Sequence, residues 1–273
     1  MHVDHFIDEL RVFAALDDNP GTDRTLSAFK SVAREYFVGE GPWKLRSAWA
    51  DIARPPFLTP DSNPKWLYHS VLVVLDEEKG INVGDPSLWA GLLARADVQP
   101  GARVLQVGGG VGYYTAILAE LVGPTGHIVS YEVEARLAKQ AARNLSDYEN
   151  VEVRHGNAAT DLGEMDRIDL VISFAGVTHV PQLWASHLAP DAQLLLPLTG
   201  KDWWGAMILA HQTDSGFNAV TLGRCGFYPC TGARRDDLAA QVSNLFANPK
   251  HLRNWSLRII GQDDDIRVEA ASV

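Results

Sequence analysis

The sequence predicts an α/β fold with a mostly parallel sheet of seven strands that ends in an antiparallel hairpin. Short apolar runs alternate with segments of helical spacing between residues 102 and 197. A cluster of glycines follows the first of these runs, where a strand would turn into a helix. After residue 197, two longer apolar runs are joined by a short segment that contains Gly216. Strands joined through helices run parallel, whereas strands joined by a short turn run antiparallel.

Residues 1–80 are expected to form a helical, aromatic-rich extension of this domain. Apolar side chains recur at helical spacing from Asp4 to Leu16, and Thr22 or Asp23 is expected to cap a second helix that runs to Phe37. The stretch 43–68 contains too many prolines for regular structure and too many aromatic residues for a free linker, including Trp43, Trp49, Trp66 and Tyr68. We expect it to pack on the main domain, to cover the substrate pocket as a lid, or both.

The regular alternation is expected over 81–234. A helix is predicted from Pro86 to Ala96, with Asp85 as its N-cap and proline at the first helical position. Strands are predicted at 102–107, 127–131, 151–154, 168–174, 192–197, 204–211 and 219–228, and helices at 112–122, 133–145 and 181–188. A C-terminal extension, 235–273, is expected to hold a helix at 236–246, a strand at 255–260 and a frayed acidic tail.

The glycine cluster indicates a nucleotide-like ligand. Strand 102–107 leads into Gly108, Gly110 and Gly112, and glycine has no Cβ that would collide with a ligand close to the backbone. The next strand ends in Glu132, about 20 residues beyond the glycines, where a carboxylate can bind both hydroxyls of a ribose. We therefore expect a cofactor that contains adenosine.

The spacing of these glycines favours S-adenosylmethionine over a dinucleotide. The dinucleotide fingerprint needs a glycine three positions after its second one, and that position is Tyr113. The pattern is instead G-x-G-x-G, which suits a cofactor without a diphosphate. An NAD-dependent oxidoreductase is therefore disfavoured.

Composition excludes some classes of partner. A formal net charge of −10 argues against a nucleic-acid binder, because phosphate contacts need clustered Lys and Arg. We see no signal peptide and no apolar run long enough to span a bilayer, and we expect no membrane association. Cys225 and Cys230 are the only two cysteines, which favours a reducing compartment and a cytoplasmic location. No spacing of His, Asp or Glu predicts a metal site. The oligomeric state stays open.

Five segments carry a resemblance to a known family. They are Gly80–Ala90, Val107–Ala116, Asn150–Asn157, Leu194–Leu198 and Gly226–Gly232. Over roughly residues 80 to 232, the chain resembles the protein-L-isoaspartate O-methyltransferases, a class I group that uses S-adenosylmethionine. The resemblance implies a Rossmann-like class I methyltransferase fold and transfer of a methyl group to a carboxylate-containing acceptor, on a small molecule or on a peptide or protein.

The resemblance and the glycine motif together give a set of expected cofactor contacts. These are Val83, Gly84, Gln106, Gly108, Gly110, Gly112, Tyr113, Thr115, Glu132, Val133, Asn157, Ala158 and Thr231. Gln106 and Asn157 stand where the family usually has acidic residues, and both keep the capacity to form hydrogen bonds. Gly84 stands where the family has a serine at the methyl-accepting end of the site. This change removes a hydroxyl and puts isoaspartyl specificity in question.

Three residues are candidates for catalysis. A carboxylate acceptor needs no base, whereas a phenol, amine or hydroxyl acceptor does. Sites in open α/β sheets lie beyond the carboxyl ends of the strands, so His179, after strand 168–174, is a candidate base. Its alternative role is structural, in a helix-entry loop. Asp85 and Asn82 are the other candidates, because the resemblance places their loop over the methionine end of the cofactor, although Asp85 also suits a helix cap.

Other function classes stay open beside the carboxylate O-methyltransferase. Gly84 and the eight tryptophans favour a small-molecule O- or N-methyltransferase with an aromatic-lined pocket. A non-catalytic protein that binds S-adenosylmethionine or S-adenosylhomocysteine would carry the same cofactor motifs. Only turnover separates that protein from an enzyme.

Overall fold

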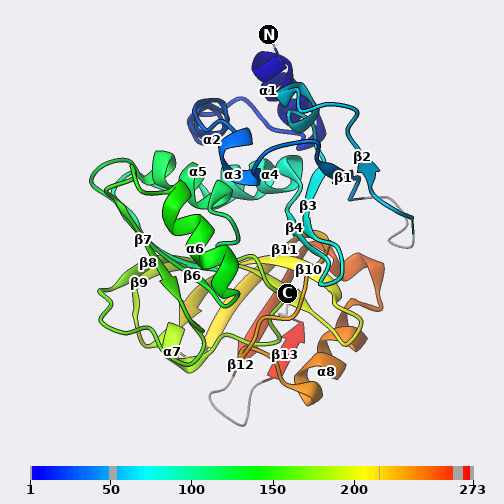
Figure 1. The fold of residues 1–273 in the computed structure, drawn as a ribbon. Coiled ribbons are helices and arrows are strands. Elements are labelled where there is room, and N and C mark those ends of the chain that lie inside the picture. Colours follow the sequence, from blue (N-terminus) through cyan, green and yellow to red (C-terminus); the bar gives the residue numbers. More distant parts are fainter. Residues whose placement is uncertain (1, 49–53, 215, 261–266, 271–273) are drawn as a thin grey trace.

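The computed structural model describes residues 2–48, 54–214, 216–260 and 267–270. Its largest element is a nine-stranded sheet with the order β13-β12-β11-β10-β9-β8-β5-β6-β7 (Figure 1). Five strands pair in parallel: β5 (Arg103–Val107), β6 (His127–Glu132), β7 (Val151–His155), β8 (Ile168–Ser173) and β9 (Leu188–Thr199). Four antiparallel strands continue the sheet from β9: β10 (Trp204–Thr213), β11 (Gly216–Gly226), β12 (Arg253–Ile260) and β13 (Arg267–Ala270).

The predicted fold class is confirmed, but the sheet is larger than the seven strands expected. Strand β12 lies against β11 and β13 lies against β12, so the C-terminal segment extends the sheet beyond the hairpin. The expectation of a frayed tail is wrong for residues 267–270, which form β13. This pairing satisfies backbone N–H and C=O groups that would otherwise stay exposed along the edge of β11.

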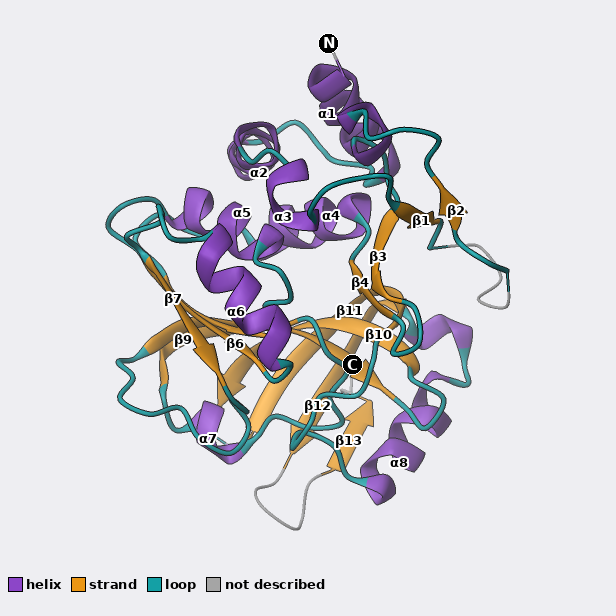
Figure 2. Cartoon of the chain, in the orientation of Figure 1, coloured by secondary structure: helices purple, strands orange, loops and turns teal. Residues whose placement is uncertain are grey.

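Both faces of the sheet are buried. Neighbouring residues of β5 illustrate this, because Val104 belongs to one apolar cluster and Leu105 to the other. One cluster lies under α4 (Pro86–Ala96), α5 (Tyr113–Val122) and the N-terminal helices, and the other lies under α8 (Asp236–Phe246). Helix α6 (Ala135–Asn144) packs on β6 and β7, as Figure 2 shows. Helix α7 (Gln182–Ala185) is shorter than predicted, since strand β9 already begins at Leu188.

The N-terminal helices form a layer above α4 and α5 (Figure 1). They are α1 (His2–Phe13), α2 (Pro20–Ser31) and α3 (Glu35–Val38). The predicted start of the second helix is wrong: the side chain of Asn19 accepts a hydrogen bond from Thr22 N at 3.0 Å, and Pro20 occupies the first turn. The helix ends at Ser31 because the backbone of Val32 is extended.

The proline-rich stretch contains regular structure that the sequence analysis did not expect. Strands β1 (Lys44–Arg46), β2 (Phe57–Leu58), β3 (Leu72–Asp76) and β4 (Ile81–Val83) form a small antiparallel sheet with the order β2-β1-β3-β4. The prolines lie between these strands or in the short 3₁₀ helix Pro64–Leu67, where no ladder hydrogen bond is lost. A second 3₁₀ turn covers Pro249–His251. Trp49 lies outside the described residues. The β3–β4 hairpin crosses the expected domain boundary at residue 80.

Within the described ranges, no helix is both long enough and apolar enough to cross a membrane.

Candidate active site

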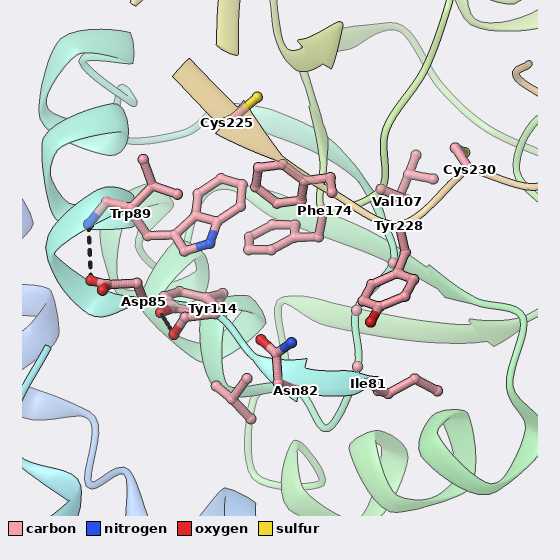
Figure 3. A pocket seen from close by; sticks show the side chains of 18 of the residues that line it. Ile81, Asn82, Asp85, Trp89, Val107, Tyr114, Phe174, Cys225, Tyr228 and Cys230 are labelled. Atoms are coloured by element: carbon pink, nitrogen blue, oxygen red, sulfur yellow. Dashed lines mark hydrogen bonds between the residues drawn. The ribbon is translucent and has the colours of Figure 1, made fainter. Parts of the chain in front are cut away.

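A cavity of about 710 Å³ lies beyond the carboxyl ends of β5 and β6 (Figure 3). One end of it is lined by the glycine turn after β5 and by the loops after β6 and β7. The other end is lined by the β3–β4 hairpin, by α4 and by strands β10 and β11. The cavity therefore lies where ligands bind in open α/β sheets, with additional walls from both ends of the chain.

The glycine turn borders the cavity with exposed backbone. Gly108 and Gly110 have φ angles of +83° and +57°, which strongly favour glycine. A Cβ on Gly110 would meet no atom within 4 Å, so a ligand can approach this backbone closely. Gly112 does not line the cavity, contrary to expectation. A Cβ there would lie 2.7 Å from Leu145 Cδ1, so this glycine allows α5 to pack closely beside the residues that follow α6.

Glu132 ends β6 beside this turn and is nearly buried. Its Oε2 accepts a hydrogen bond from Gly110 N at 2.8 Å, and its Oε1 accepts one from Glu134 N at 2.9 Å. The carboxylate thus fixes the glycine turn to the next loop while it faces the cavity. This is the position in which a carboxylate can bind a ribose.

The loops after β6, β7 and β11 supply a partly apolar part of the wall. Val133 is 48% exposed and lines the cavity, as do Ala158 and Thr231. Asn157 also lines the wall, and its Oδ1 accepts a hydrogen bond from Ala159 N at 3.0 Å. An amide oxygen has two lone pairs, so Asn157 can accept a second hydrogen bond from a ligand.

Two expected cofactor contacts are not at the cavity wall. Gln106 and Thr115 are fully buried, and Thr115 Oγ1 donates a hydrogen bond to Gln106 Oε1 at 2.7 Å. The side chain of Gln106 points to helix α5 instead of the ligand space. Both residues therefore support the cavity wall from behind it.

The two tyrosines that open α5 have different environments. Tyr114 donates its hydroxyl to Gly84 O at 2.7 Å, whereas the buried hydroxyl of Tyr113 has no partner among the described residues. Both rings border the cavity. Burial raises the pKa of Tyr113 to about 12 and raises the pKa of Tyr114 as well. Neither phenol is ionised at neutral pH.

The loop before α4 lies at the same cavity. Asp85 caps α4, because its Oδ1 accepts hydrogen bonds from the backbone N–H groups of Ser87 at 2.8 Å and of Leu88 at 3.3 Å. Asn82 donates to Gly80 O at 3.1 Å, and its side chain reaches the cavity wall (Figure 3). The expected cap is confirmed, and Asn82, Val83, Gly84 and Asp85 all line the cavity.

Comparison with known proteins identifies the family. Residues 9–235 match the sequence profile of the family described as Protein-L-isoaspartate(D-aspartate) O-methyltransferase (PCMT). The chain belongs to this family. A protein-L-isoaspartate O-methyltransferase of Pelotomaculum thermopropionicum is 30% identical over 154 residues, which cover 56% of this chain and 67% of that protein. One of Methanothermobacter thermautotrophicus is 25% identical over 191 residues, which cover 69% of this chain and 87% of that protein.

Solved structures show the same fold. A protein-L-isoaspartate O-methyltransferase aligns with a TM-score of 0.69 and 19% identity, over 99% of this chain and 88% of that one. A putative enzyme of this name from Plasmodium falciparum, in complex with S-adenosyl-L-homocysteine, aligns with a TM-score of 0.62 and 18% identity, over 84% of this chain and 97% of that one. PCMT proteins are methyltransferases that use S-adenosylmethionine as the methyl donor.

The cavity of this PCMT protein fits that cofactor. The open backbone at Gly110 would leave room for the methionine portion, Glu132 would bind the ribose, and Val133 would offer an apolar surface to the adenine. When bound, the cofactor supplies an electrophilic methyl group on a sulfonium. Among the described residues, no group of three or more His, Cys, Asp or Glu side chains is placed to hold a metal.

His179 lies away from this cavity. It lines a separate, smaller hollow with Pro181 and Phe217, and its Nδ1 lies 3.1 Å from Thr178 Oγ1. Burial lowers the pKa of His179, and the nearby charge of Arg235 lowers it further. The prediction that His179 approaches the methyl acceptor is therefore wrong for this structure. After β8 the backbone N–H of Gly176 donates to Tyr228 O and that of Thr178 donates to Ala233 O, so His179 follows a segment held against the loop after β11. Periodicity alone does not reveal these long-range contacts.

Several cavity residues were not expected from the sequence. Trp89 and Phe174 stack at a ring distance of 3.7 Å in the wall, and β10 and β11 contribute Trp204, Leu222 and Arg224. The sequence did contain a signal for Trp89. It lies three residues after Pro86, the expected and observed start of α4, and the loop before this helix was expected at the site. The contribution of β10 and β11 depends on how the antiparallel strands fold beside α4, and no local motif indicates it.

Proposed function

We propose that this protein methylates a carboxylate of a peptide or protein, with S-adenosylmethionine as donor. The observation that carries the proposal is one continuous cavity that joins the Glu132 end to an acceptor end without any histidine in its described lining. A carboxylate oxygen needs no base, because its lone pair forms the new O–CH₃ bond while the C–S bond breaks and its electron pair stays on sulfur. A hydroxyl or amine acceptor would have to lose a proton.

The other titratable groups of the acceptor end also make poor bases. Burial raises the pKa of the Cys225 thiol and raises that of Cys230 to about 12, so both are protonated at neutral pH. The Oδ1 atom of Asp85 is engaged as the helix cap. Arg95 and Arg224 line the cavity, and neither forms an ion pair with a described residue. Two such cations favour an anionic acceptor.

The proposed acceptor follows from the family and from these charges together. The relatives are named for methyl transfer to isoaspartate in proteins. We therefore place a peptide or protein carboxylate ahead of a small molecule. Cys225 and Cys230 are free, which supports a reducing compartment such as the cytoplasm.

We also propose that the β3–β4 hairpin, which lines the acceptor end, reaches across the cavity to the cofactor end and acts as a lid. Lys79 Nζ in its turn lies 2.6 Å from Glu134 Oε2, two residues beyond Glu132. At Gly80, a Cβ would lie 1.6 Å from the hydroxyl of Tyr228, so the turn also touches the loop after β11. These two contacts join the hairpin to opposite sides of the cavity mouth.

Transfer of labelled methyl from S-adenosylmethionine to an isoaspartyl peptide, measured as a base-labile methyl ester, tests the function. We expect ester formation that saturates with peptide and that is lost in Glu132→Ala. A protein that binds S-adenosylhomocysteine but forms no ester with any peptide carboxylate would refute the proposal and direct the search to small molecules.

A further inference from the structure

The acceptor end of the cavity contains a tryptophan whose indole N–H donates to no described residue. Trp89 is 0% exposed and lines the cavity. The buried indoles elsewhere differ: Trp43 donates to Gly39 O at 2.9 Å and Trp184 donates to Ala158 O at 2.8 Å. Trp89 Nε1 is not one of the fully enclosed polar atoms that lack a partner, such as Gln106 Nε2, so it borders the cavity space. What occupies the cavity, water or ligand, can therefore accept its hydrogen bond.

The indole N–H group of Trp89 lies close to Gly84. A Cβ on Gly84 would lie 2.7 Å from Trp89 Nε1 and 3.7 Å from Tyr114 Cε2, so the indole fills the space that any side chain at residue 84 would need. In Figure 3 the nitrogen is on the ring edge nearer Tyr114. A serine at position 84 would offer a hydroxyl donor, and Gly84 offers none. The indole N–H of Trp89 occupies the space where that side chain would lie.

The ring of Trp89 is held rigidly beside the methyl-donor end. It stacks on Phe174 with an interplanar angle of 23°, and Phe227 meets it edge-on at 6.0 Å. Phe174 Cβ in turn lies 3.5 Å from where a Cβ on Gly108 would be. The Trp89–Phe174 stack therefore bridges the loop at Gly84 and the glycine turn, which is where donor and acceptor must meet.

The acceptor end also has a large apolar surface beside its two arginines. Six aliphatic or thioether side chains from β3, α4, β10 and β11 line it, namely Leu72, Leu75, Leu88, Leu92, Met207 and Leu222. Apolar side chains on either side of an acceptor carboxylate would gain free energy when they are buried against this surface.

We propose that Trp89 binds the methyl-accepting carboxylate through its indole N–H, and that the substrate carries this carboxylate between apolar or aromatic side chains. This inference rests on the proposed function and names the substrate class of the same site. One carboxylate oxygen accepts the Nε1–H bond and the other faces the methyl donor. Trp89 is then the residue that determines which carboxylates react.

The test compares two synthetic isoaspartyl hexapeptides, one with Ser and Gly neighbours and one with Phe and Leu neighbours. The wild-type chain is expected to show about tenfold higher kcat/KM for the apolar peptide. Trp89→Phe keeps a ring but removes the donor, and we expect kcat/KM for that peptide to fall about 10- to 150-fold, mainly through KM, as for one lost hydrogen bond to a charged group. Calorimetry should show unchanged affinity for S-adenosylhomocysteine.

Trp43→Phe is the matched control, since Trp43 is also buried but does not line the cavity. It should leave both peptides' kinetics unchanged. Equal wild-type kcat/KM for the two peptides would overturn the proposal, and so would a Trp89→Phe variant that binds S-adenosylhomocysteine and retains wild-type kcat/KM. If Trp89→Phe does not fold, the wild-type comparison alone decides. Wild-type protein that binds S-adenosylhomocysteine but methylates neither peptide would instead refute the proposed function.

Discussion

The cofactor end and the acceptor end of the cavity are built from different parts of the chain. The cofactor end comes from the turns after β5, β6 and β7, all between Gly108 and Asn157. The acceptor end combines β3, α4, the loop after β8, β10 and β11, which are far apart in sequence. A short run of consecutive parallel strands can thus produce a cofactor site by itself, whereas specificity for the acceptor depends on long-range packing. The following predictions test this division.

Glu132→Ala should have the largest effect on the cofactor end. The change would remove the proposed ribose contact, and it leaves the N–H groups of Gly110 and Glu134 without their acceptor. We expect affinity for S-adenosylhomocysteine to fall by about 2–3 kcal/mol, roughly 30- to 150-fold. Isothermal titration calorimetry measures it, with Glu132→Gln as the milder variant that keeps one acceptor oxygen. Unchanged affinity would mean that the ribose binds elsewhere.

A matched pair of glycine variants separates backbone strain from ligand contact. Gly108 and Gly101 both have φ of +83°, but only Gly108 lines the cavity. Each change to alanine should cost about 1–2 kcal/mol of folding stability, as measured by urea unfolding. Weaker binding of S-adenosylhomocysteine is expected for Gly108→Ala alone. An equal loss of binding in Gly101→Ala would show that strain, not contact, controls affinity.

The tyrosine pair tests the junction between the two ends. Tyr114→Phe removes the hydrogen bond to Gly84 O and should cost about 1 kcal/mol of stability. Tyr113→Phe removes a buried hydroxyl that has no described partner, so stability should be unchanged or slightly higher. Chemical denaturation of both variants checks this. A larger loss for Tyr113→Phe would mean that its hydroxyl has an important partner, such as water.

The smallest effect on activity is expected at His179. It lies outside the cavity, so His179→Gln should leave methyl transfer unchanged. Because the folded-state pKa of His179 is lowered, the unfolded chain binds its proton more readily. This contribution to stability is complete above the unfolded pKa of about 6.5 and is lost as pH falls from there through the folded pKa. Urea midpoints should therefore fall more steeply below pH 6.5 in the wild type than in His179→Gln. A loss of turnover would instead restore His179 as a catalytic candidate.

The cofactor end follows from local features of the sequence. A strand, a glycine turn with positive φ angles and a carboxylate on the next strand are local features, and parallel pairing brings Gly110 and Glu132 together. The cap at Asp85 is local as well, because capping depends on the next few residues.

The directions of the remaining side chains depend on how distant segments pack against one another. Gln106 was correctly placed on β5, but its side chain faces α5, and Gly112 serves the packing of α5 beside Leu145. His179 was placed correctly along the chain and incorrectly in space. Trp89 acquires its significance only from Phe174 and Gly84, which lie on different elements. Such contacts form only when segments far apart in the sequence pack together. Hydrophobic periodicity predicts which face of a helix or strand is buried, but it does not predict which residues contact that face.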